Sequence, residues 1–432
     1  MQQALLSNQV GAEPMPAIWR QVRWHVVALL FVATVINFVD RQTLSLVAPL
    51  LRETFRLSNT DYGVIVAAFQ LGMLVGELPM GWLMDRIGPR IGLTLAVISW
   101  SVANALHAAA GSVAQFRLLR FWLGTSECGN FSGGVKVVSE WFPVRERALA
   151  VGIFNGGALI GAVIAPPLIV ALTLHWGWRM AFLAPSLMGM TWVLLWAPFY
   201  RDPSDHAGVT KAEAALISGE PEPALPPPRT LDLLRLRETW GIMLCRFLVG
   251  PVFQFYIYWL PEYLYRARGL SLKSVGAFGW VPFLMGDIGS ITFGWLAGAL
   301  IRRGLAVPSA RRQTLLLGAA LCVLGLAVVT IRDPYAAIIV IGLVLFGHTG
   351  LSANMFAAIS DVFPNNAVAR VTGLTGVAGG LSGMLFPVLT GVLVDRISYT
   401  PVFLLTAAMP LAGVVALMML SDLRRVNFTL PR

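Results

Sequence analysis

Residues 127–152, which read ECGNFSGGVKVVSEWFPVRERALAVG, recur in altered form as residues 348–373, HTGLSANMFAAISDVFPNNAVARVTG. The two stretches share a glycine, a serine followed by an acidic residue, a Phe-Pro pair and a final glycine. All of these lie at one constant offset (348 − 127 = 221) without gaps. A register kept over this length indicates an internal repeat whose period of 221 residues is about half of the 432-residue chain.

Long apolar runs surround both copies of the repeat. A helix needs about 20 mostly apolar residues to cross a bilayer, and irregular backbone cannot face lipid. We therefore predict an all-α membrane protein of twelve transmembrane helices, in two six-helix halves related by a pseudo-twofold axis. The predicted spans lie near residues 23–50, 61–83, 90–111, 115–139, 147–171, 178–199, 239–265, 275–301, 312–331, 335–360, 369–395 and 400–421.

The composition agrees with a protein that uses lipid as its solvent. Apolar residues make up 56% of the chain and charged residues only 12%, with a mean hydropathy of +0.71. The net charge of +10 lies in short loops between apolar runs, so we predict no nucleic-acid partner. Most of the basic loop residues fall on the side of both termini, which predicts that the N and C termini are cytoplasmic.

A polar segment divides the chain into its two halves. It contains a short stretch of helical character at residues 211–217 and a proline-rich run at residues 221–228. Its composition is typical of a linker. The predicted organisation is an N-terminal segment (1–22), the first half (23–199), the linker (200–238), the second half (239–421) and a tail (422–432).

Several classes of enzyme and metal site are absent from the sequence. The three cysteines lie inside apolar runs, away from metal-ligand spacing, and no histidine is followed by glutamate. No lysine follows a glycine, so the chain has no phosphate-binding P-loop. We predict that the protein is not an enzyme, holds no metal or cofactor, and takes its energy from an ion gradient.

A charge inside a membrane span costs ~2.5–3.5 kcal/mol, and four of the charged residues within predicted spans, with one asparagine, are candidates for the site. Arg120 and Glu127 are seven residues apart and share a helix face, as do Asn37 and Arg41, which are four apart. Either arginine is suited to bind a substrate carboxylate through paired hydrogen bonds. Glu127 is the first candidate for the proton-binding group, because a dry site favours a neutral carboxyl, and Asp40 is the second.

A purely architectural ion pair between the first and fourth spans is the alternative for these residues. A static pair of arginine and carboxylate needs no proton. If the arginine must leave the carboxylate to bind an anion, protonation of the carboxylate weakens the ion pair and makes this release easier. We expect proton binding and anion binding to be coupled in this way.

Uncharged polar groups in other spans are candidate substrate contacts. Each of them can also form an interhelical hydrogen bond, which is the alternative reading. His348 stands out because it is the repeat counterpart of Glu127. The candidates are Gln70, Asn155, Gln254, Tyr258, His348 and Asn354.

The loop after the second span, GWLMDRIGPR at residues 81–90, resembles the G-x-x-x-D-R-x-G-x-R signature of the major facilitator superfamily. The twelve-span plan is similar to that family throughout. The resemblance implies that Asp85 works with Arg147, at the start of the fifth span, as a conformational latch. Arg86 and Arg90 belong to the same motif.

Further motifs resemble the anion:cation symporter branch of that superfamily. They include NFVDR at 37–41, LRF at 119–121, EWFPVRER at 140–147 and YWLP at 258–261. The likeness covers residues 24–420 and is nearest to bacterial hexuronate and aldonate transporters. Phe38 and Met73 depart from it, since some aldonate carriers have tyrosines there.

The resemblance implies a monomeric, multi-pass protein of the bacterial inner membrane that carries a small organic anion with protons as the coupling ion. We expect symport of a hexuronate or an aldonate by alternating access. An organic-anion exchanger and a sugar-acid sensor with a transporter fold are the alternatives.

Overall fold

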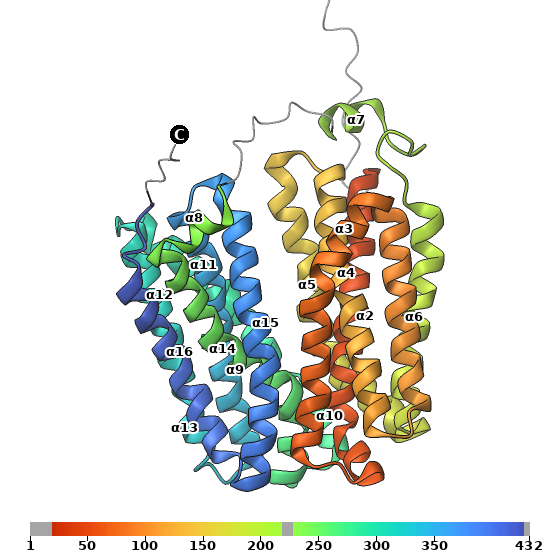
Figure 1. The fold of residues 1–432 in the computed structure, drawn as a ribbon, viewed down its shortest axis with the longest axis vertical. Helices are drawn as coiled ribbons and strands as arrows, with labels where there is room; N and C mark the ends of the chain where they lie inside the picture. Colours follow the sequence, from red (N-terminus) through yellow and green to blue (C-terminus); the bar gives the residue numbers. More distant parts are fainter. Residues whose placement is uncertain (1–19, 218–227, 427–432) are drawn as a thin grey trace, which may run out of the picture.

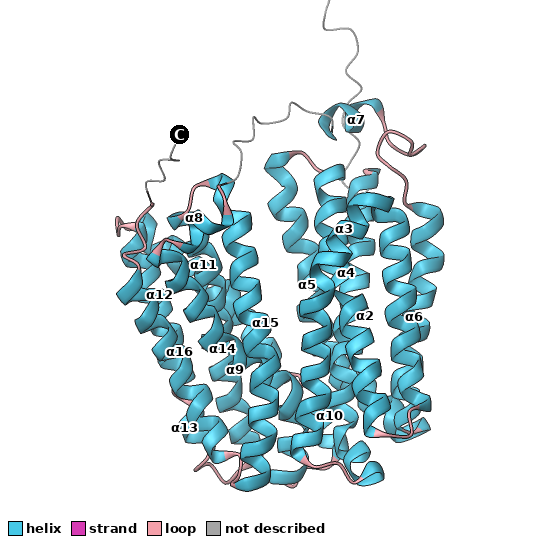
Figure 2. Cartoon of the chain, in the orientation of Figure 1, coloured by secondary structure: helices cyan, strands magenta, loops and turns pink. Residues whose placement is uncertain are grey.

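The computed structural model describes residues 20–217 and 228–426, and every regular element within these ranges is a helix (Figures 1 and 2). The fold class predicted from the sequence is therefore confirmed as all-helical. Most of the predicted N-terminal segment, most of the proline-rich run and the end of the predicted tail lie outside the described residues.

The first half of the chain forms the right-hand bundle in Figure 1. Its long helices are followed by the short helix α7, which belongs to the predicted linker. The bounds are α2 (Val22–Phe55), α3 (Asn59–Leu106), the 3-10 turn η2 (His107–Ala109), α4 (Val113–Trp141), α5 (Val144–Trp176), α6 (Trp178–Phe199) and α7 (Lys211–Ile217).

The second half forms the left-hand bundle, and its short helix α10 reaches across to lie against the first (Figure 1). The bounds are α8 (Thr230–Leu234), α9 (Arg237–Glu262), the π-turn η3 (Tyr263–Ala267), α10 (Leu272–Phe278), α11 (Val281–Arg302), α12 (Val307–Cys322), α13 (Gly325–Val328), α14 (Pro334–Val362), α15 (Asn365–Arg396) and α16 (Thr400–Leu420).

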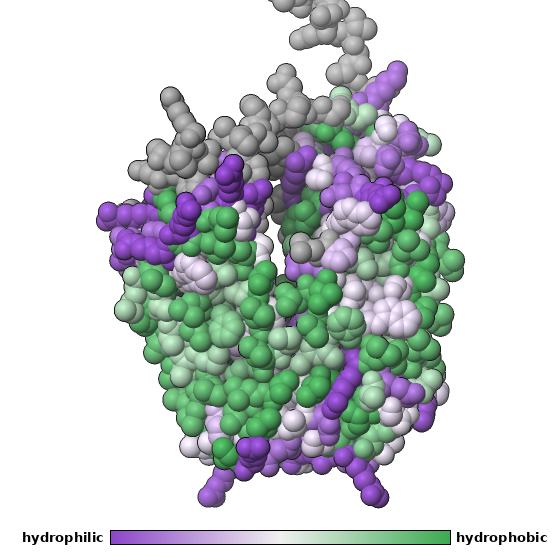
Figure 3. All heavy atoms as spheres, viewed as in Figure 1, coloured by the Kyte–Doolittle hydropathy of each residue, from purple (hydrophilic) through white to green (hydrophobic). Residues whose placement is uncertain are grey.

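Each predicted span coincides with helix, and ten helices among the described residues are long and apolar enough to cross a membrane. The two remaining segments, near 61–83 and 115–139, are helical parts of α3 and α4 with more polar sequences, so the count of twelve stays a prediction. On the face shown in Figure 3, apolar side chains cover most of the middle and polar ones gather at the two ends.

The structure reproduces the internal repeat in its helix boundaries. Helices α4 and α14 each contain 29 residues, and α14 begins and ends 221 positions after α4 (334 − 113 and 362 − 141). The shared Phe-Pro pair explains the common boundary. A residue before proline is pushed out of the helical conformation, so α4 ends before Phe142 and α14 before Phe363.

Helices α3 and α4 pack backbone to backbone at two glycines. A Cβ on Gly72 would lie 2.2 Å from the carbonyl oxygen of Phe121, and a Cβ on Gly124 would lie 2.2 Å from that of Phe69. Glycine is required at both positions because no side chain fits between main chains this close. This contact fixes α4, which carries the charged residues of the site, against α3.

Replacing Gly72 with alanine should lower the melting temperature of the purified protein, because relieving the clash means separating the two helices. Overpacking of this kind costs about 1–3 kcal/mol. Gly152→Ala is the matched control, since its Cβ would meet nothing within 4 Å and alanine favours helix by about 0.5–1 kcal/mol. Equal melting temperatures for the two variants in detergent would contradict the close packing.

The short stretch of helical character predicted at residues 211–217 is helix α7, with the same limits. Its buried Glu213 accepts hydrogen bonds from the backbone amides of Val22 (3.3 Å) and Arg23 (3.1 Å). A carboxylate at this position satisfies the unpaired amides at the start of α2 and complements the helix dipole. This part of the linker therefore caps the first long helix.

The two halves touch at the end of the molecule opposite α7 and α8, here called the far side (Figure 1). Asp395, at the end of α15, accepts four hydrogen bonds from the start of α3. They come from the backbone amides of Asn59 (2.9 Å) and Thr60 (2.7 Å) and from the side chains of the same two residues (2.8 and 2.6 Å). We call this contact of Asn59, Thr60 and Asp395 the far-side clasp.

A second set of contacts lies beside the clasp. The buried carboxylate of Glu262 on α9 pairs with Arg52 of α2, and Arg266 contacts both Glu262 (3.0 Å) and Glu53 (3.7 Å). The Tyr62 hydroxyl of α3 donates to the carbonyl of Tyr258 (2.6 Å). Polar and charged contacts therefore close the far side.

The opposite end, here called the linker side, carries α7 and α8 (Figure 1). In the space-filling view the surface is hollowed between the two bundles toward this end (Figure 3). The ion pairs found here each lie within one half: Arg23–Glu146 and Lys136–Asp85 in the first, Arg311–Asp361 and Arg312–Asp422 in the second. The structure is closed on the far side and open on the linker side.

Candidate functional site: a buried charged cluster beside a cavity

The core of the site is an ion pair between α2 and α4. The Oε2 atom of Glu127 accepts hydrogen bonds from Nε (3.2 Å) and Nη2 (3.1 Å) of Arg41. Glu127 is fully buried, whereas 18% of the Arg41 side chain is exposed. Asn37, one turn before Arg41, accepts from the same Nη2 (3.1 Å). The predicted shared face of Asn37 and Arg41 is therefore present.

Asp40 points to a different helix than its neighbour Arg41. It is completely buried, and its Oδ1 accepts from the amide of Asn104 on α3 (2.6 Å). Its Oδ2 has no hydrogen-bond partner among the described residues. Both carboxyl groups thus lie in the protein interior, but only Glu127 pairs with an arginine.

Arg120 is the most unusual residue of the cluster. Its side chain is 1% exposed, and Nε, Nη1 and Nη2 all lack a hydrogen-bond partner in the part of the chain that the structure describes. The guanidinium lies 5.8 Å from the ring centroid of Phe69, which the guanidinium of Arg41 also approaches, at 5.3 Å. A buried cation with five unused donors is suited to bind an anion.

The second half contributes polar groups from α9. The amide of Gln70 on α3 donates to Gln254 across the boundary between the halves (2.6 Å). Tyr258 is 2% exposed, and its hydroxyl has no partner among the described residues. Three of the predicted polar contacts therefore meet at the boundary of the halves.

A cavity of about 350 Å³ lies between the halves. Helices α2 and α5 line one side and α9, α11 and α14 line the other. Phe38 joins it to the cluster, because the Arg41 guanidinium lies over the Phe38 ring at 4.6 Å. The polar lining residues are Arg246, Gln254, Asp287, Ser290, His348, Thr349 and Ser352.

The remaining predicted contacts have different surroundings. His348 lines the cavity, with Nε2 3.1 Å from the carbonyl of Val249 and its ring stacked on Phe253. Asn155 is half-buried on α5, one turn before two lining residues. Asn354 is not among the residues that line the cavity. Its side-chain oxygen accepts a hydrogen bond from Arg311 (2.8 Å), and its amide donates to the carbonyl of Gly350.

The residues of the predicted latch lie at the linker side. Asp85 pairs with Lys136 of α4 (2.9 Å), and Arg147 donates to the carbonyls of Ser139 and Phe142. The two are not brought together in this structure. Arg90 donates to the carbonyl of Ala197 and Arg86 lies over Trp82. Between them, Gly88 has φ +75°, which explains the kink within α3.

Two charged lining residues were missed as site candidates. Neither Asp287 of α11 nor Arg246 of α9 is among the site residues predicted from the sequence. The Nε of Arg246 is buried without a partner among the described residues. The signal for Asp287 was available, because an acidic residue within an apolar span is a functional candidate by default.

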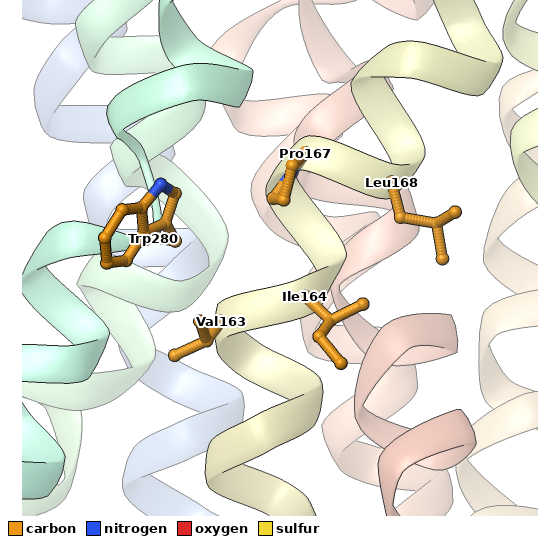
Figure 4. Close-up of a pocket in the computed structure, with 5 residues that line it drawn as sticks. All are labelled: Val163, Ile164, Pro167, Leu168 and Trp280. Carbon is orange, nitrogen blue, oxygen red and sulfur yellow. The ribbon is translucent and has the colours of Figure 1, made fainter.

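A smaller pocket between α5 and the loop before α11 has no such chemistry. Val163, Ile164, Pro167, Leu168 and Trp280 line it, and all present apolar surfaces (Figure 4). It offers no charged partner for an anion. The cavity beside the charged cluster is therefore the better candidate for a substrate site.

Two helical bundles around a buried cluster of charges and a cavity between them define a polytopic membrane transporter. The model of the Major Facilitator Superfamily matches residues 30–347 and 309–429. The chain belongs to the Major Facilitator Superfamily, as its motifs predicted. The prediction that it is a transporter rather than an enzyme is confirmed, since the family and its relatives are transporters.

Relatives with assigned substrates cover most of the chain. The hexuronate transporter of Escherichia coli (strain K12) is 34% identical over 403 residues, which are 92% of this chain and 93% of that protein. The galacturonate transporter of Dickeya chrysanthemi is 32% identical and covers 73% of this chain and 94% of its own length. The D-galactonate transporter of Escherichia coli O6:H1 is 27% identical, and the match covers 94% of this chain and 97% of that protein.

A solved structure confirms the fold. A bacterial homolog of the human lysosomal transporter Spinster, in an inward-facing and unoccupied conformation, superposes with a TM-score of 0.72. The superposition covers 96% of this chain and 97% of the other chain, and the two sequences are 18% identical. This likeness concerns the fold alone.

Proposed function

We propose that the protein is a proton-coupled symporter of a sugar-acid monoanion, either a hexuronate or an aldonate. The unpartnered guanidinium of Arg120 carries this proposal, because a buried cation with free donors fits a carboxylate better than any neutral solute. The Arg41–Glu127 pair beside it supplies the proton site. The relatives that transport hexuronate, galacturonate and galactonate support this substrate class.

In the proposed cycle the substrate carboxylate binds Arg120 and competes with Glu127 for Arg41. Protonation of Glu127 weakens its hold on Arg41, so proton and anion bind together. Asp40 is the second candidate proton site. Groups on α9 and α14, among them Gln254, Tyr258 and His348, contact the hydroxyls.

Alternating access moves the two halves around this site. The protein lies in the bacterial inner membrane as a monomer with both termini in the cytoplasm, so the linker side opens to the cytoplasm. The far-side clasp then holds the inward-facing state, and the latch residues around Asp85 act in the opposite state.

Uptake into proteoliposomes tests the proposal. Labelled glucuronate, galacturonate and galactonate are offered with the outside more acidic than the inside. We expect at least one of them to accumulate only while the pH gradient lasts. Movement of none of the three would contradict the substrate class. Uptake that requires an internal organic anion and ignores the pH gradient would indicate an exchanger instead.

Removing the far-side clasp should favour the outward-facing state. Asp395→Ala deletes four hydrogen bonds across the halves, and we expect a shift of about 1–2 kcal/mol for a partly exposed contact. Spin labels at Thr54→Cys and Ile397→Cys, one in each half on the far side, report the distance by pulsed electron resonance.

In the Asp395→Ala background the distance distribution should gain a longer component. Asp333→Asn is the matched control. Asp333 also caps a helix on the far side, but within one half (2.7 Å to the amide of Ala336), and asparagine caps equally well. An unchanged distribution in Asp395→Ala would show that the clasp does not hold the halves together.

A further inference from the structure

The cavity between the halves is bordered by charged residues on both of its sides. On the side of the first half, Phe38 lines the cavity and lies under the guanidinium of Arg41, which belongs to the cluster with Arg120, Asp40 and Glu127. On the side of the second half, Arg246 of α9 and Asp287 of α11 line the cavity. We call these two lining residues the α9–α11 pole.

Asp287 makes no contact that explains its place in the bundle. It is half-buried on α11, and it has neither a hydrogen bond nor an ion pair with any described residue. A carboxylate in an apolar span is costly and seldom idle. Its side chain lines the cavity, so its ordinary partner is a molecule that occupies the cavity.

The charges of the pole also balance. Arg246 and Asp287 carry one charge of each sign, and the third ionisable lining residue, His348, faces a backbone carbonyl. The pole as a whole therefore attracts neither an anion nor a cation strongly. This environment fits the uncharged, hydroxyl-rich end of a molecule whose single charge lies at the other end.

A carboxylate is a strong acceptor with two oxygens, which suits a pair of neighbouring hydroxyls. It also repels a second carboxylate placed against it. Without Asp287, Arg246 would be the only arginine or carboxylate in the cavity lining and would attract such a group. Asp287 thus decides whether the pole accepts an alcohol or an acid.

We propose that Asp287 determines specificity for monoacids. It accepts hydrogen bonds from the hydroxyl end of the sugar acid and excludes a second carboxylate from the α9–α11 pole. This inference rests on the proposed function, since it assumes that the carboxylate of the substrate binds Arg120.

Galactonate and galactarate provide a matched pair of probes. They differ only at one end of the chain, where a primary alcohol in galactonate is a carboxylate in galactarate. Each is used to inhibit uptake of the labelled monoacid that the wild type carries in proteoliposomes. The ratio of the two inhibition constants measures the discrimination between monoacid and diacid.

The wild type should be inhibited far better by galactonate than by galactarate. In Asp287→Asn the ratio should fall at least about tenfold, because one charge–charge repulsion in a partly buried site has been removed. Asp287→Glu keeps the charge and should keep the discrimination. Asp333→Asn removes a carboxylate that lies outside the cavity lining, and this variant should behave as the wild type.

Two results would overturn the inference while leaving the proposed function intact. One is a wild type that galactarate inhibits as well as galactonate does. The other is an Asp287→Asn protein that transports with an unchanged ratio. The wild-type comparison needs no substitution, so it decides the matter even when the variant does not fold. Failure of the proposed function would appear separately, as a wild type that carries no monoacid.

Discussion

Replacing Arg120 with glutamine should abolish uptake of the sugar acid and leave the melting temperature of the protein unchanged or higher. The guanidinium is buried and forms no hydrogen bond among the described residues. A structural arginine in that position would stabilise the fold through its partners. Burying an arginine whose only partner is the substrate is costly while the substrate is absent. Replacing it therefore raises the stability of the unbound protein or leaves it unchanged.

We expect a loss of at least about 100-fold in uptake, since a charge-assisted pair is lost and the substrate carboxylate then meets no cation. Arg120→Lys should not restore the wild-type rate, because a lysine cannot form the two parallel hydrogen bonds of a guanidinium. Melting temperature and uptake are measured on the same preparations.

Arg117 provides the control one turn earlier on α4. Its side chain is 42% exposed and pairs with Asp61 (2.8 Å) on the far side, a contact worth little at the surface. Arg117→Gln should therefore transport nearly as well as the wild type. An Arg120→Gln protein that still transports, or that loses both stability and transport, would show that Arg120 is a structural residue.

Glu127→Gln should exchange the sugar acid across the membrane but fail to concentrate it. In the wild type, one proton per monoanion is electroneutral, and each unit of pH gradient supplies roughly 1.4 kcal/mol, or about tenfold accumulation. Glutamine cannot take up and release that proton. It still has an amide oxygen that can accept from Arg41, so binding and movement of the halves should continue.

Counterflow and concentrative uptake separate these two activities in the same vesicles. Glu140→Gln is the matched control on the same helix, where the carboxylate accepts from the Tyr200 hydroxyl (2.9 Å) and glutamine can do the same. It should retain both activities. If Glu127→Gln still concentrates the sugar acid, the proton site lies elsewhere, and Asp40→Asn is the next variant to measure.

The helices and the repeat could be predicted from the sequence because both depend on local patterns. Apolar runs of the required length give the helices, and the Phe-Pro pairs set the same boundary in both halves. The cluster was predictable in part. Arg41 and Asn37 share a face by spacing alone, and Glu127 was the natural partner for an arginine in a neighbouring span.

Contacts between distant segments were beyond this kind of reasoning. Nothing in the sequence indicates that Asn104 binds Asp40, or that Asp395 binds the start of α3 more than 330 positions away. Asn354 was a reasonable candidate by its span, but Arg311 reaches it from α12. Packing between helices decides which polar residues line a cavity. The spacing of residues along a single helix does not determine this.

Proton movement driven by the sugar acid tests the coupling most directly. Proteoliposomes are loaded with a pH-sensitive dye at equal pH on both sides, and the transported sugar acid is then added outside. Proton symport predicts internal acidification in the wild type and none in Glu127→Gln or in vesicles without protein. Uptake of the labelled acid by the wild type without any change of internal pH would contradict proton coupling.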